Sequence, residues 1–120
     1  MANRVDPITI TDNDTDTIYT LEFDRETVRS IENDGFSLQD LEGKPSKYYD
    51  LFYNAFLMHH RRDFTTRRLT RKKTDEMLDA IGGPLGAPNG LFERLVDLYV
   101  QAFSTLSDGD EKNGRVTVKF

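Results

Sequence analysis

Residues 52–73, FYNAFLMHHRRDFTTRRLTRKK, change character halfway along their length. The first half is apolar and aromatic. The second half, from Arg61 to Lys73, holds seven Arg or Lys residues against the single Asp63 and carries a net charge of +6. Because the whole chain carries −5, the other residues sum to −11. Such an asymmetry steers a charged partner toward the molecule or promotes head-to-tail self-association.

The apolar half of the stretch predicts a long helix at about 46–62. One of its faces, at three- and four-residue spacing, consists of Tyr48, Leu51, Phe52, Ala55, Phe56 and His59. A second wide apolar face is predicted for a helix at 91–106, with Phe103 near its centre. We therefore expect the two helices to pack on each other, with Phe56 and Phe103 buried.

Outward from these helices, the chain predicts an α+β fold. Alternating apolar residues at 6–12 and 17–23 predict an antiparallel β-hairpin. The remaining expected elements are a helix at 25–34 after the N-cap Asp24 and before Gly35, a very short helix at 37–43 with Ser37 as N-cap, a helix at about 67–81 capped by Thr65 or Thr66, and a loop at 84–90. The architecture is a small N-terminal hairpin packed with about four helices.

A single domain is expected at 1–106, followed by a polar, mobile tail at 107–120. Within that tail, residues 115–120, RVTVKF, alternate again and either add a strand to the hairpin or hang free.

Composition excludes several classes of function. The 120 residues contain no cysteine, so neither a disulfide framework nor a thiolate zinc site nor a cysteine nucleophile can form. No window approaches the roughly 18 apolar residues of a membrane span, and the N-terminus MANRVDPITI lacks the apolar core of a signal peptide. We expect a soluble cytoplasmic protein with no membrane partner.

Chemical motifs are incomplete throughout the chain. Asp12, Asp14 and Asp16 have the spacing that begins an EF-hand loop, but Thr17 and Phe23 replace the glycine and the bidentate glutamate. His59 and Asp63 could share a metal ion, yet a stable site needs three or four ligands. The glycines of GGPLGAPNG lack the Walker lysine. We therefore expect no enzyme activity, no metal and no cofactor.

The remaining candidates for function are partner-binding residues. Leftover apolar surface on a soluble protein marks a partner site, and a tyrosine ring contributes area while its hydroxyl stays hydrated. The candidates on these grounds, together with the basic run, are Tyr48, Tyr49, Tyr53, Arg61, Arg62, Arg67, Arg68, Arg71 and Lys72. Arg67, Arg68, Arg71 and Lys72 are expected on one helix.

Three interpretations of the basic run remain open. The arginines could form a solvated helix face, contact an acidic protein or a second copy of the chain, or bind the phosphates of a nucleic acid. The sequence pI of about 5.0 is unlike that of nucleic-acid modules, which are basic throughout. A solvated face or a protein contact ranks first and nucleic acid second.

The order of elements resembles the small tail assembly chaperones of long-tailed bacteriophages and prophages. The resemblance is carried by IYTLEFDRETVRSIENDGF from Ile18, by KPS in the next loop, and by LFYNAFLMHHR from Leu51. It covers about residues 17–62, and beyond them only the helical character matches. It implies a non-enzymatic factor of the host cytoplasm, absent from the mature virion, that binds the tape-measure protein while tail-tube protein is recruited around it. The family signature is one of packing, so it assigns no site residues.

Overall fold

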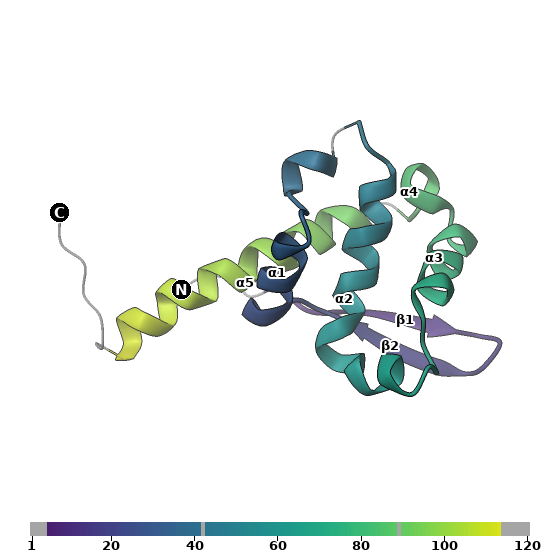
Figure 1. The fold of residues 1–120 in the computed structure, drawn as a ribbon, viewed down its shortest axis with the longest axis horizontal. Coiled ribbons are helices and arrows are strands. Elements are labelled where there is room, and N and C mark those ends of the chain that lie inside the picture. Colours follow the sequence, from purple (N-terminus) through teal and green to yellow (C-terminus); the bar gives the residue numbers. More distant parts are fainter. Residues whose placement is uncertain (1–4, 42, 89, 114–120) are drawn as a thin grey trace.

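A computed structural model describes residues 5–41, 43–88 and 90–113, with side chains as far as Ala102 (Figure 1). In this part of the chain an N-terminal β-hairpin packs with five α-helices, which confirms the predicted α+β fold. None of the helices, over the same residues, has the length and apolarity needed to cross a membrane.

The hairpin pairs β1 (Ile8–Asp12) with β2 (Thr17–Leu21) in antiparallel register, from Ile8 opposite Leu21 to Asp12 opposite Thr17. Both strands lie within the predicted ranges. The carboxylate of Asp12 accepts a hydrogen bond from the backbone N–H of Asp14 at 3.0 Å. This aspartate therefore helps to close the turn between the strands.

The hairpin leads into α1 (Arg25–Asn33) through the predicted cap. The Asp24 carboxylate accepts from the backbone N–H of Thr27 at 2.8 Å, and the Thr27 hydroxyl accepts from the backbone N–H of Asp24 at 2.9 Å. This reciprocal pair satisfies two donors that the start of a helix leaves open. A short 3-10 helix, η1 (Leu38–Leu41), follows within the very short helix predicted at 37–43.

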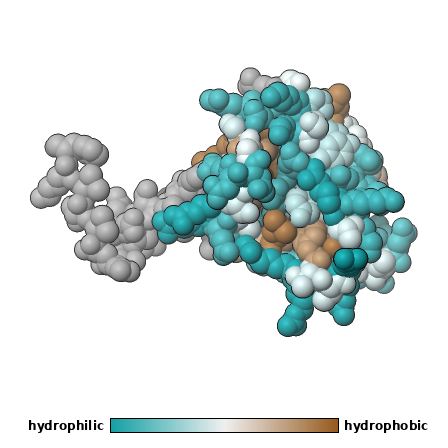
Figure 2. Space-filling view, in the orientation of Figure 1, coloured by the Kyte–Doolittle hydropathy of each residue, from teal (hydrophilic) through white to brown (hydrophobic). Residues whose placement is uncertain are grey.

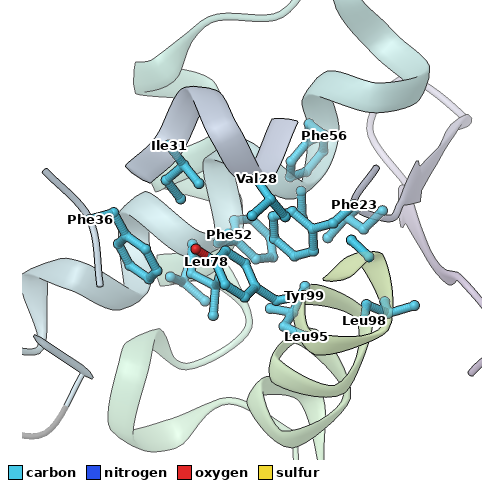
Figure 3. Close-up of a cluster of buried hydrophobic side chains, with 14 of the residues drawn as sticks. Phe23, Val28, Ile31, Phe36, Phe52, Phe56, Leu78, Leu95, Leu98 and Tyr99 are labelled. Atoms are coloured by element: carbon cyan, nitrogen blue, oxygen red, sulfur yellow. The ribbon is translucent and has the colours of Figure 1, made fainter. Parts of the chain in front are cut away.

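The core forms where α2 (Ser46–Thr65) and α5 (Leu91–Asn113) meet α1 and β2. Figure 3 shows side chains from α1, α2 and α5, together with Phe23 just after β2, converging on one another. The fully buried large residues include Phe52, Phe56, Leu95, Leu98 and Tyr99. The predicted burial of Phe56 is confirmed, whereas the side chain of Phe103 lies outside the described residues.

The last helix is longer than predicted. α5 continues past the expected end at Leu106 to Asn113, and its ribbon projects from the body of the molecule in Figure 1. The predicted strand at 115–120 lies outside the described residues. The mobility of residues 107–120 stays a prediction.

The predicted helix at 67–81 is wrong at its beginning. α3 (Arg71–Ala80) starts four residues later, and its N-cap is Thr70 instead of Thr65 or Thr66. The Thr70 hydroxyl accepts from the backbone N–H of Lys73 at 3.2 Å. Arg67 has a positive φ of 63°, a left-handed conformation that ends helical continuity before α3. The expected loop at 84–90 also contains a one-turn helix, α4 (Gly83–Gly86).

Candidate functional site

The basic segment follows a sharp bend in α2 at His60, where φ is −128°. Tyr53 and Phe64, eleven positions apart, would be separated by roughly 16 Å along a straight helix. Their ring centroids are 5.2 Å apart, in edge-to-face geometry. The bend therefore folds the last turns of α2 back toward the body of the same helix, and Arg61 and Arg62 are carried with them.

Hydrogen bonds of the His60 side chain hold the bend. Its Nε2 accepts from the backbone N–H of Thr20 at 2.9 Å, and its Nδ1 lies 3.1 Å from an Asp63 carboxylate oxygen. Since a backbone N–H can only donate, Nε2 is unprotonated and Nδ1–H donates to Asp63. The imidazole also packs edge-to-face on Tyr19, with a centroid separation of 5.2 Å. The bend is thus fixed to β2.

His59 makes a separate contact with β2. Its Nε2 lies 2.8 Å from a carboxylate oxygen of Glu22, a buried residue just after the strand. Asp63 pairs with His60 and not with His59, so the His59–Asp63 pair considered for a metal is not formed. Within the described ranges no group of three or more His, Asp or Glu side chains could hold a metal ion.

Four cations on the end of α2, the following loop and the start of α3 have charged groups that form no hydrogen bond with a described residue, whereas Lys73 beside them donates to the Arg68 carbonyl at 2.9 Å. We call this set, Arg62, Arg67, Arg68 and Lys72, the basic corner. All four are exposed, and their charged groups form no ion pair with any described residue. Arg61, next to them, pairs with Glu26 of α1 at 3.5 Å, with both side chains largely exposed. Exposed pairs of this kind contribute little to stability.

Arg71 does not belong to this free set, although the sequence grouped it with Arg67, Arg68 and Lys72. Its guanidinium donates to Asp50 at 2.6 Å and to Asp75 at 3.0 Å. It also lies over the ring of Tyr53, 4.9 Å from the centroid. Partial burial acts to lower the pKa of Arg71, but the bonds to the two carboxylates outweigh it and raise that pKa. Arg71 fastens α3 to α2.

Each candidate tyrosine of α2 has an intramolecular contact and is half-buried. Tyr48 packs on Phe92 of α5, with centroids 4.6 Å apart. The Tyr49 hydroxyl donates to Asp79 of α3, and this bond raises the pKa of Tyr49. Tyr53 lies between Phe64 and Arg71. Their role in partner binding stays a prediction, and only Tyr53 adjoins the basic segment.

Apolar side chains lie on the turns of α2 just before the bend. Figure 2 shows hydrophobic atoms among polar ones on the face in front of α2. On the turn of α2 that precedes the bend, Leu57 and Met58 are half-buried. A pocket of about 180 Å³ opens nearby, between the end of α1, α2 and Arg71. It is lined by Ile31, Asp34, Phe36, Lys47, Asp50, Tyr53, Asn54 and Arg71.

The fold is a small α+β domain with exposed cations beyond the bend of α2 and half-buried apolar side chains on the turns before it. The chain belongs to the DUF5055 family, described as a domain of unknown function, whose sequence profile matches residues 1–120. No curated protein and no solved structure matches the chain.

Proposed function

We propose that this protein is a non-catalytic tail assembly chaperone of a long-tailed bacteriophage or prophage. It binds the tape-measure protein in the host cytoplasm, helps to recruit tail-tube subunits, and is absent from the mature virion. Two things support the proposal: the resemblance of residues 17–62 to such chaperones, and a surface suited to holding a protein segment.

The basic corner is the observation that carries this proposal. The four exposed cations of this set, which lie beyond the bend of α2, have no ion-pair partner among the described residues. Half-buried Leu57 and Tyr53 lie on the preceding turns. An amphipathic helix with acidic flanks matches such a surface, because its apolar face covers the side chains of α2 while its carboxylates meet the arginines.

The two parts of this surface have different tasks. Apolar anchors that become buried hold most of the affinity of an interface, and charges at the rim mainly tune association rate and selectivity. The basic corner thus selects an acidic segment, and the apolar part of α2 retains it. The net charge of −5 keeps the free chaperone soluble.

The alternative is a small regulator that binds nucleic acid through the same cations. The observation in its favour is that the basic corner is exposed and unpaired within the described part of the chain. Against it, Arg71 is occupied by Asp50 and Asp75, and the acidic remainder of the molecule repels phosphates.

Co-expression with a tape-measure segment tests the choice. We expect the native chaperone to keep the segment soluble. A variant with Gln at Arg62, Arg67, Arg68 and Lys72 should retain the segment only in part. The matched control places Gln at Arg25, Arg29, Lys44 and Arg94, which removes the same charge from exposed positions elsewhere. This control should behave like the native protein.

Nucleic-acid binding is measured on the same variants. We expect weak binding without sequence preference. A regulator would instead lose affinity in the basic-corner variant, and its salt slope would fall by up to about 0.9 for each phosphate that is no longer neutralised. Sub-micromolar, sequence-selective DNA binding together with no solubilisation of tape-measure segments would overturn the proposal.

A further inference from the structure

The two edges of the hairpin differ in how their backbone groups are satisfied. The outer edge of β2 is closed by α2: the Thr20 N–H donates to His60 at 2.9 Å, and the Glu22 N–H donates to the Ala55 carbonyl at 3.0 Å. These outward bonds show that the backbone groups of even-numbered residues of β2 point away from β1. Thr20 faces Thr9 across the hairpin, so Thr9 also points its backbone groups outward.

Along β1 the direction of the backbone groups alternates in the same way, so those of Thr9 and Thr11 point away from β2, at the outer edge of the hairpin. The backbone groups of Thr9 and Thr11 make no hydrogen bond to any residue that the structure describes. Beside this edge, Ile8 and Ile10 pack on the core but stay only half-buried. An open edge with apolar surface next to it is a template for one more strand.

The chain carries a segment with the matching pattern, at residues 115–120, RVTVKF, outside the described ranges. A strand of this sequence places Val116, Val118 and Phe120 on one face and Arg115, Thr117 and Lys119 on the other. The charges are complementary as well. The segment has two cations, and Asp6, Asp12, Asp14 and Asp16 lie at the two ends of β1.

We propose that residues 115–120 of a second copy of this chain pair antiparallel with β1. In the register that we infer, Val116 lies opposite Ile10, Thr117 opposite Thr9, and Val118 opposite Ile8. The valines then complete the cover of the half-buried isoleucines. Arg115 lies opposite Thr11, at the end of β1 that leads into the acidic turn at residues 12–16. This self-association is independent of the proposed chaperone function.

The geometry of α5 favours a second copy over the chain's own tail. Gln101 of α5 donates to the Val5 carbonyl at 3.3 Å, so the start of β1 lies near Gln101. Asn113 lies roughly 18 Å further along the helix, and the far end of β1 lies roughly 23 Å from Val5. Figure 1 shows α5 and the hairpin pointing in opposite directions from the body.

With α5 helical as far as Asn113, a return within one chain is therefore too long for the linker. In this antiparallel register Arg115 must reach Thr11, near the far end of β1. From Asn113 to Arg115 the backbone spans at most about 7.6 Å, far less than the combined length of the projecting helix and the strand. Pairing with the hairpin of a second copy does not depend on the length of this linker.

The absence of native cysteine allows a direct test by crosslinking full-length chains. One protein carries Thr9→Cys and another carries Thr117→Cys. Hydrogen-bonded antiparallel neighbours have Cα atoms about 5.5 Å apart, which suits a disulfide. Mixed at the highest soluble concentration and mildly oxidised, the two proteins should give the mixed disulfide dimer as the main product.

Two further proteins serve as the control and the discriminating case. Glu93→Cys, at an exposed position on α5, replaces Thr9→Cys and should give a several-fold lower yield of mixed dimer with Thr117→Cys. A chain carrying both Thr9→Cys and Thr117→Cys should form crosslinked dimers. Crosslinking only within single chains, or a yield of mixed dimer no higher than in the control, would overturn the proposal.

Discussion

Gly82 is the residue whose backbone conformation depends most clearly on the absence of a side chain. It ends the turn after α3 with a φ of +118°, and a Cβ at this position would lie 2.1 Å from the carbonyl oxygen of Gly86. Both the left-handed conformation and the backbone clash oppose any larger residue. We expect Gly82→Ala to lower the free energy of unfolding by about 1–3 kcal/mol, measured by denaturant titration.

A matched control lies four residues later. A Cβ at Gly86 would meet nothing within 4 Å, and Gly86 does not have a positive φ. Gly86→Ala should therefore change stability by less than about 0.5 kcal/mol. Equal denaturant midpoints for the two variants would show that α4 can rearrange around residue 82.

Side-chain chemistry at the site was predictable only in part. The sequence identifies Arg62, Arg67, Arg68 and Lys72 as clustered cations because they are close along the chain, and they are exposed as expected. The bond from Arg71 to Asp75 lies at the i, i+4 spacing of one helix, but its bond to Asp50 could not be predicted. Its partner Asp50 lies 21 positions earlier, and the two meet only because the chain returns on itself after the bend.

At the scale of elements, His60 joins the bend of α2 to the edge of β2. The substitution His60→Phe keeps a ring against Tyr19 and Phe56 but removes both nitrogens. The partly buried Thr20 N–H then loses its acceptor, which costs about 1–3 kcal/mol. We expect a lower denaturant midpoint and faster amide exchange at Thr20.

His59→Gln is the comparison variant. The side chain of His59 is more exposed than that of His60, and glutamine can still donate a hydrogen bond to Glu22. It should leave the exchange of the Thr20 amide unchanged. If His60→Phe also leaves that amide protected, the closure of the β2 edge by this imidazole is wrong.

Elements with local signals were the predictable ones. The capping residue Asp24, the period-two strands and the glycine after α1 each act within a few residues, and the structure has all three. The bend at His60 and the late start of α3 have no such signal. HHRRD contains neither glycine nor proline, and Thr65, Thr66 and Thr70 are equally good caps by sequence. The bend is fixed by the contact of His60 with β2, and the start of α3 by the contact of Arg71 with α2.

For the whole molecule, one core joins nearly every element. Buried side chains from β2, α1, α2, α3 and α5 form a single cluster, so these elements should unfold together. The distal part of α5 is the exception in shape, because its ribbon projects beyond that cluster. The sequence predicted a mobile tail from residue 107, and the structure continues the helix to Asn113.

Amide exchange in dilute solution distinguishes a mobile tail from a stable helix at residues 107–113. Helical hydrogen bonds that are not supported by burial open locally, and short unpacked helices are marginally stable in water. We therefore expect strong protection around Phe56 in α2 and from Leu95 to Ala102 in α5, with protection falling steeply through residues 107–113. At low protein concentration the copies do not pair, so pairing between copies cannot stabilise the tail in this measurement. Protection that stays uniform from Leu95 to Asn113 would contradict the predicted mobility, because the projecting helix would then be as stable as the core.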